Sequence, residues 1–95
     1  MATTQETIRT ITVVNKLGVH ARPSAMLVQL ANQFQADLLV SRDGEDDEVN
    51  AKSIMGVMML AAAKGTVLRF RAMGDDGDAL LDAVDKLFLS KFNEE

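Results

Sequence analysis

The stretch IRTITVVNKLGVHARPSAMLVQLANQFQ, residues 8–35, decides the fold because its hydrophobic period changes once along its length. Residues 8–14 are rich in β-branched side chains that roughly alternate with polar ones, which predicts a strand. A loop over residues 15–19 follows. From Pro23 onward, apolar residues recur at helical spacing, and proline suits the first turn of a helix. We therefore expect a helix from Pro23 to about Gln35.

The rest of the chain adds three strand-like segments and two helical ones. The strand-like segments are residues 36–42, 48–51 and 66–72. The helical segments are residues 53–63, with Ser53 as a candidate N-cap and Lys64 and Gly65 as a stop, and a C-terminal helix with Leu80, Val84, Leu87 and Phe88 on one face. The predicted fold is α+β in the order β-α-β-β-α-β-α, an antiparallel sheet with helices on one face.

Two acidic runs accompany these elements. The run DGEDDE (43–48) lies between two predicted strands, and DDGD (75–78) precedes the C-terminal helix. Glycine among charged residues is typical of solvated turns, so both runs are expected to be turns. Aspartate also suits the positive end of the helix that follows the second run.

Composition limits the classes of function. The 95 residues predict a single domain over 1–95 with its core in residues 8–90, and the absence of cysteine excludes disulfides and fits a cytoplasmic location. No segment approaches the roughly 20 apolar residues of a membrane span, so no membrane insertion is expected. A net charge of −4, with four phenylalanines as the only aromatic residues, disfavours nucleic-acid binding.

The only histidine, His20, lies directly before the predicted helix, with Arg22 two residues further on. Unpaired N–H groups and the dipole at a helix N-terminus favour an anion. Neutral imidazole is a nucleophile, and an arginine offers a planar fork of donors to phosphate oxygens. The residues alone leave two interpretations open: an anion or phosphoryl site, or an ordinary capping or surface histidine. One histidine without cysteine predicts no metal site and no cofactor.

A second segment, NAKSIMGVMMLAAAKG (residues 50–65), carries three methionines within five positions. Methionines at helical spacing are typical of a core, but a flexible thioether surface also suits the docking of several partners. Ser53 is either an ordinary N-cap or a site of phosphorylation, where added charge would lie beside that apolar surface.

Together, in this order, GVHARPS (18–24) and NAKSIMGVMMLAAAKG resemble the active-site and regulatory segments of the HPr family, the histidine-containing phosphocarriers of the bacterial phosphoenolpyruvate-dependent phosphotransferase system. The resemblance covers about residues 8–90. It implies that His20 accepts a phosphoryl group on Nδ1 from phosphorylated enzyme I and passes it to an acceptor of the enzyme IIA type, with Arg22 as the neighbouring active-site arginine. Such a protein is a stoichiometric carrier, not an enzyme.

The resemblance also implies regulation and docking. Ser53 matches the serine phosphorylated by HPr kinase/phosphorylase. Ile54, Met55 and Met58 match an exposed docking patch, whereas Val57 is expected to be buried. The implied fold is an open-faced β-sandwich of four antiparallel strands with three helices on one side, and the protein is expected to be a monomer.

Two departures from the family pattern stand out. Ser24 occupies a position where the family more often has alanine, which adds a hydroxyl near the expected phosphate. The acidic turn 43–48 makes the hairpin longer and more acidic than in the family.

Two other functions are alternatives to a phosphocarrier. One is a regulatory binding module controlled through Ser53, which His20 beside Arg22 disfavours as the sole role. The other is an acylphosphatase-like hydrolase of similar size and plan, but no Gly-rich loop leads here to a catalytic arginine and asparagine. Whether the acceptor serves sugar uptake or a regulatory branch stays open.

Overall fold

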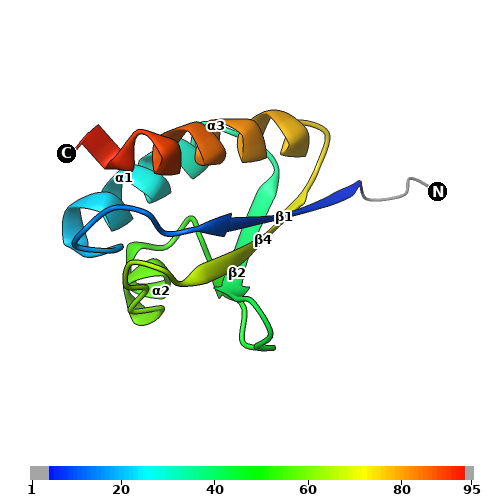
Figure 1. The fold of residues 1–95 in the computed structure, drawn as a ribbon. Helices are drawn as coiled ribbons and strands as arrows, with labels where there is room; N and C mark the ends of the chain where they lie inside the picture. The colour runs from blue at the N-terminus through cyan, green and yellow to red at the C-terminus, as the bar shows by residue number, and fades with distance from the viewer. Residues whose placement is uncertain (1–4, 94–95) are drawn as a thin grey trace.

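The computed structural model describes residues 5–93 and confirms the predicted order of strands and helices (Figure 1). The elements are β1 (Glu6–Thr12), α1 (Ala21–Ala31), β2 (Asp37–Arg42), β3 (Val49–Asn50), α2 (Ile54–Met59), β4 (Val67–Met73), α3 (Gly77–Leu89) and a short 3-10 turn, η1 (Lys91–Asn93). The predicted domain over 1–95 also includes residues 1–4 and 94–95, which lie outside the described residues.

The four strands form one sheet in the order β1-β4-β2-β3, with every neighbouring pair antiparallel. Strand β1 pairs with β4 along its whole length, from Glu6 opposite Met73 to Thr12 opposite Val67. Helices α1 and α3 lie over one face of the sheet (Figure 1). The start of α1 and the end of α3 therefore come together beyond the same end of the sheet, where β1 ends.

The core lies between the sheet and the helices, and the sequence pattern predicts it well. On β4, Leu68, Phe70 and Ala72 are fully buried, whereas the residues between them face outward. On α3, Leu80, Val84 and Phe88 are buried as expected, and Leu87 is packed against the core. Each large apolar side chain buried in this way contributes about 1.5–3 kcal/mol of transfer free energy.

Helix α1 differs from its predicted bounds at both ends. It begins at Ala21, so Pro23 lies inside its first turn, and it ends at Ala31 rather than at about Gln35. At its C-terminal end, the Asn32 side-chain amide donates to the Val28 carbonyl at 2.9 Å. The next two N–H groups, of Gln33 and Phe34, bond three residues back instead of four, which tightens and ends the helix.

Helix α2 is shorter than the predicted 53–63 because a distant arginine occupies its C-terminal carbonyl groups. The guanidinium of Arg42, at the end of β2, donates to the carbonyls of Leu60 and Ala61. Ala61 has a φ of 47°, in the left-handed region, so the chain leaves the helix there. The expected stop at Lys64 and Gly65 was wrong because the partner on β2 ends the helix earlier.

The acidic turn between β2 and β3 is exposed over residues 43–47, as predicted, but its last residue is not simply solvated. Glu48 accepts two hydrogen bonds from the Arg71 guanidinium on β4, at 2.6 and 2.9 Å. This pairing holds the pKa of Glu48 below its usual range. The longer hairpin is thus fastened to the outer face of the sheet.

Asp76 was expected to favour the N-terminus of α3, and the structure gives its side chain another role. It occupies the N-cap position without a side-chain capping bond. Its carboxylate instead accepts the backbone N–H groups of Gln35 and Ala36, at 2.9 and 2.8 Å. Asp76 therefore ties the loop after α1 to the loop before α3.

Replacing Asp76 by asparagine is expected to lower the free energy of unfolding at neutral pH. The hydrogen bonds from the backbone N–H groups of Gln35, first, and Ala36 lower the pKa of the Asp76 carboxyl. The carboxylate therefore stabilises the fold fully above the ordinary carboxyl pKa of about 4, and this stabilisation is lost as the pH falls through the lowered pKa. Urea denaturation across this range should show the two proteins converging at low pH. The exposed neighbour provides a control: Asp75→Asn removes the same charge, and an equal loss of stability in both variants would contradict the role given to Asp76.

Candidate functional site

Hydrogen bonds hold the loop after β1 in a conformation that places His20 at the start of α1. Gly18 donates its N–H to the Asn15 carbonyl at 3.1 Å, and the Asn15 side-chain amide donates to the Gly18 carbonyl at 2.6 Å. Gly18 has a φ of 71°, which favours glycine. The next residue, Val19, donates to the carbonyl of Ala62 at 2.8 Å, so the loop is joined to the segment that follows α2.

His20 is the N-cap residue of α1, as the sequence indicated. Its backbone is extended, with φ −93° and ψ −160°, and its carbonyl accepts the first helical bond, from Ser24 N–H at 2.9 Å. Its imidazole makes no capping bond to the helix. His20 therefore occupies the N-cap position through its backbone, and its side chain does not act as the cap. The ring is partly exposed where the helix dipole favours negative charge.

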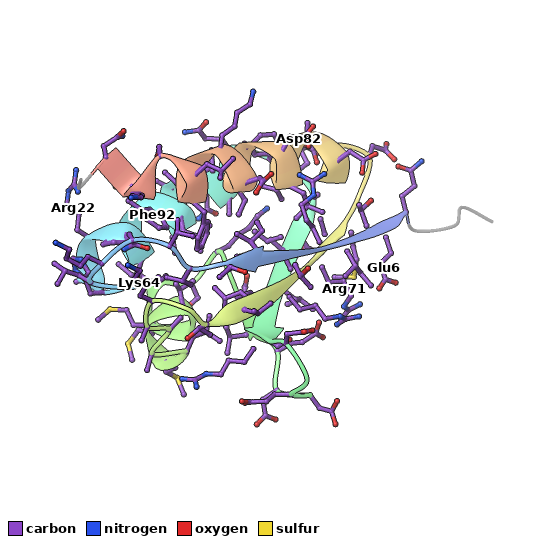
Figure 2. The ribbon with its side chains drawn as sticks, viewed as in Figure 1. Glu6, Arg22, Lys64, Arg71, Asp82 and Phe92 are labelled. Atoms are coloured by element: carbon purple, nitrogen blue, oxygen red, sulfur yellow. The ribbon has the colours of Figure 1, made fainter. Side chains whose placement is uncertain are left out.

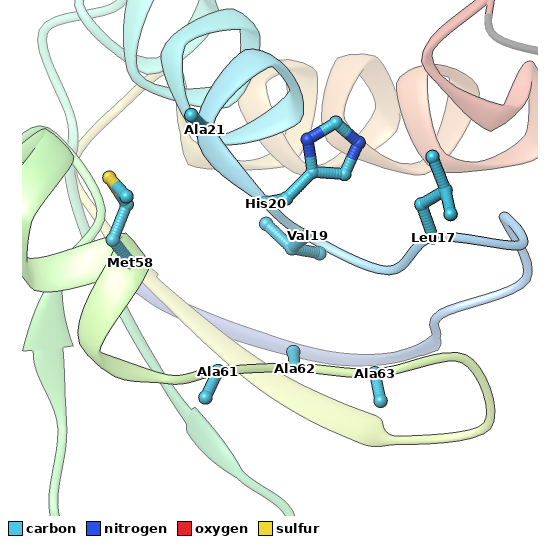
Figure 3. Close-up of a pocket in the computed structure, with 8 residues that line it drawn as sticks. All are labelled: Leu17, Val19, His20, Ala21, Met58, Ala61, Ala62 and Ala63. Atoms are coloured by element: carbon cyan, nitrogen blue, oxygen red, sulfur yellow. The ribbon is translucent and has the colours of Figure 1, made fainter.

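A hollow of about 310 Å³ lies beside His20. It separates the loop before α1 from the segment that joins α2 to β4 (Figure 3). Its lining is mostly small or apolar and consists of Leu17, Val19, His20, Ala21, Met58, Ala61, Ala62 and Ala63. Leu17 is 72% exposed, and sequence reasoning singled out neither Leu17 nor the three alanines. Only the fold brings these alanines next to the histidine loop.

Arg22 lies in the first turn of α1 rather than before the helix as predicted, because α1 begins at Ala21, and its side chain is directed toward the end of α3. One guanidinium nitrogen, Nη1, donates to the Phe92 carbonyl at 3.3 Å. Both residues lie at the end of the molecule where α1 begins and α3 ends (Figure 2). Sequence reasoning missed Phe92 because contacts 70 residues apart leave no local signal.

Ser24, where the family more often has alanine, is fully buried in the first turns of α1. Its hydroxyl makes no hydrogen bond within residues 5–93. A serine in this position of a helix could bond to the carbonyl four residues earlier, but here the hydroxyl does not do so. That the hydroxyl approaches a bound phosphate stays a prediction.

The predicted role of Ser53 as the N-cap of α2 is confirmed, since its Oγ accepts the Gly56 N–H at 3.3 Å. The helix that follows exposes an apolar surface, which we call the α2 face. Its members and their exposed fractions are Ile54 42%, Met55 70%, Met58 47% and Met59 76%. Val57 is fully buried, as expected. The alternative that these methionines belong to the core is therefore wrong.

The described residues contain neither a cluster of metal ligands nor a membrane-spanning helix. Within residues 5–93, no three metal-ligating side chains of the His, Cys, Asp or Glu type gather into a group. Among the helices of the same residues, none has both the length and the apolar character to cross a membrane.

Comparison with known proteins gives one consistent result. Residues 7–90 match the family described as the PTS HPr component phosphorylation site. Phosphocarrier protein HPr of Xylella fastidiosa strain Temecula1 is 52% identical over 90% of this chain and 93% of its own length, and that of Treponema pallidum is 47% identical over 93% and 98%.

The fold agrees with that assignment. A crystal structure of HPr-C-His from Thermoanaerobacter tengcongensis superposes with a TM-score of 0.86 and 44% identity, covering 94% of this chain and 98% of the other. The hydrolase alternative is excluded, because this family consists of phosphocarriers rather than catalysts. The chain therefore belongs to the HPr family of phosphocarrier proteins of the phosphotransferase system.

Proposed function

We propose that His20 is the residue on which this phosphocarrier holds its phosphoryl group, receiving it from enzyme I and passing it to an acceptor of the enzyme IIA type. The observation that carries the proposal is that His20 occupies the N-cap position of α1, beside an open hollow, with an imidazole that does not cap the helix. A neutral ring nitrogen attacks the phosphorus as the bond to the donor breaks. Transfer to the acceptor returns the carrier unchanged.

The surroundings of His20 suit a transient anion. The N-terminus of α1 contributes a favourable dipole, about 0.3–1 kcal/mol for an exposed charge. Arg22 lies in the same turn, and its guanidinium can exchange one neutral carbonyl for charged phosphoryl oxygens, which form stronger hydrogen bonds. By resemblance to the family, we assign the phosphoryl group to Nδ1 and Arg22 to its stabilisation.

Incubation with phosphoenolpyruvate and enzyme I, followed by intact-mass analysis, tests this proposal. Because the chain has one histidine, any phosphohistidine that forms must be on His20. We expect one phosphate per chain that is lost after brief acid treatment. No incorporation, with the same enzyme I active on another carrier, or only acid-stable phosphate, would overturn the assignment.

The α2 face and Leu17 together are suited to docking. Ile54, Met55 and Met58 expose large apolar side chains, and Met58 also lines the hollow beside His20. Thioether side chains adapt their shape, so one surface can fit a donor and an acceptor in turn. We therefore assign the docking of enzyme I and of the acceptor to this surface. We also predict that the protein is cytoplasmic and monomeric.

We further assign Ser53 as a regulatory phosphorylation site, for a kinase of the HPr kinase/phosphorylase type. Ser53 is partly exposed and lies directly before Ile54, so a phosphate there places about −1.5 to −2 charge at the edge of the docking surface. Desolvating that charge against an apolar partner is unfavourable. Phosphorylation would then weaken docking without unfolding the protein.

Replacing Ser53 by aspartate is expected to slow phosphoryl acceptance from enzyme I by about tenfold, through weaker association. Rates would be measured at enzyme I concentrations well below saturation. Ser53→Asn is the matched control, because asparagine is also a good N-cap and nearly the same shape but is neutral. Equal rates for both folded variants would contradict a role of charge at this position.

A further inference from the structure

We infer that Phe92 is a positioning residue for phosphoryl transfer: its buried ring fixes a left-handed C-terminal turn whose carbonyl holds the Arg22 guanidinium at the start of α1. This inference rests on the proposed function of His20 and Arg22. It adds a residue 70 positions away from the arginine, in a segment that the sequence motifs do not include.

The backbone of this turn is unusual. Lys91, Phe92 and Asn93 have φ angles of 55°, 54° and 59°, and none of them is glycine. The left-handed region is unfavourable for residues with a Cβ, and consecutive residues there are rarer than single ones. Such a turn persists only where surrounding contacts hold it in place.

The side chain of Phe92 provides that contact. It is fully buried, and its ring meets that of Phe88 edge-on, with centroids 4.8 Å apart. Phe88 in turn packs edge-on against Phe70 of β4 at 5.8 Å, so the turn is anchored through α3 to the sheet. Asn93 N–H donates to the Ser90 carbonyl at 3.0 Å and closes the turn.

The position of the Phe92 carbonyl follows from the anchored ring. With the side chain buried and φ near 54°, the carbonyl faces the first turn of α1, where it accepts from Arg22 Nη1 at 3.3 Å. Figure 2 shows Arg22 and Phe92 at this common end of the molecule. A carbonyl bond of this length restrains the guanidinium but is weak enough to be exchanged for an anion.

This arrangement would favour the reaction by ordering the arginine before the phosphoryl group arrives. An unrestrained arginine side chain loses rotamer freedom when it binds, whereas a restrained one loses less. When the phosphoryl group leaves, the guanidinium returns to the carbonyl. The turn therefore affects the transfer rate only through Arg22, whereas a general loss of stability would slow transfer whether or not Arg22 is present.

The test compares Phe92→Ala with two controls. Phe92→Leu keeps a large apolar anchor, and Phe70→Leu weakens the other edge-on contact with Phe88 without touching the turn. We expect Phe92→Ala to slow phosphoryl acceptance by about fivefold, Phe92→Leu to restore most of the rate, and Phe70→Leu to lower stability only. NMR relaxation of the Arg22 side-chain Nε should show greater mobility in Phe92→Ala alone.

A double-mutant cycle decides whether Phe92 acts through the arginine. In an Arg22→Ala background, Phe92→Ala should cause no further slowing. Equal slowing with and without Arg22, or equal rates for Phe92→Ala and Phe70→Leu at matched stability, would overturn the inference. The proposed function fails differently, since the wild-type protein would then take up no acid-labile phosphate. If Phe92→Ala does not fold, Phe92→Val replaces it: valine removes the ring that packs against Phe88 but keeps an apolar side chain, and slower acceptance with greater mobility of Arg22 Nε is expected, whereas unchanged mobility in the folded variant would overturn the inference.

Discussion

Replacing His20 by alanine is expected to abolish acid-labile phosphate while leaving the fold intact. The chain has no second imidazole that could take over the phosphoryl group. Because the His20 side chain makes no capping bond to α1, its removal should change the free energy of unfolding by less than about 1 kcal/mol. Intact-mass analysis after incubation with enzyme I and phosphoenolpyruvate, together with urea denaturation, measures both effects.

The control for this variant is His20→Asn. Asparagine is a favourable N-cap, so it supports the start of α1 at least as well as histidine does, but its amide is no nucleophile. Loss of phosphate in both variants would show that the ring itself carries the group. Phosphate retained by either variant would place the group on another residue, and retention by His20→Asn alone would mean that the helix start, not the imidazole, decides acceptance.

Local sequence patterns predicted those features whose causes are local. The alternation of Leu68 and Phe70 with Arg69 and Arg71 requires only that one face of β4 be buried, and the structure buries that face. Ser53 caps α2 through a bond to Gly56, three residues away. Such interactions span a few residues, so their signals are present in the sequence.

Features that depend on distant partners could not be predicted in the same way. The end of α2 is set by Arg42, from another strand, and Asp76 serves the loop after α1 instead of its own helix. Nothing near Asp76 in the sequence distinguishes it from Asp75, which has the same residue type and the same acidic surroundings. Its role follows only from the packing of α1 against α3.

The candidate site shows the same division. His20 and Arg22 lie in one short motif, so they could be singled out from the sequence, and the resemblance to the family supplied the chemistry proposed for them. The hollow beside His20 could not be predicted from the sequence. One side of it is formed by the loop before α1, and the other side by Ala62 and its neighbours, more than forty residues further along the chain. Leu17 gave no signal either, since a single leucine in a loop is equally typical of a partly buried side chain.

The histidine loop and the segment between α2 and β4 are in close contact at Gly18, and this contact is the basis of the second prediction with a large effect. Replacing Gly18 by alanine is expected to lower the free energy of unfolding by about 3 kcal/mol. A Cβ at this position would lie 2.5 Å from the Ala62 carbonyl oxygen and 2.9 Å from Ala63 Cα, both backbone atoms. The same Ala62 oxygen accepts the Val19 N–H, so relieving the clash would pull the histidine loop away from the α2–β4 segment.

A matched glycine separates the clash from the backbone conformation. Gly44 also has a positive φ, 89°, but a Cβ there would meet no atom within 4 Å. Gly44→Ala should therefore cost only the left-handed conformation, about 1 kcal/mol, and leave phosphoryl acceptance unchanged. Gly18→Ala should in addition slow phosphoryl acceptance under conditions where both variants are folded, because the clash moves the histidine loop away from the segment around Ala62. Equal losses of stability and equal rates in the two variants would show that the loop tolerates the added methyl group. The close approach of Gly18 to Ala62 would then not determine the position of His20.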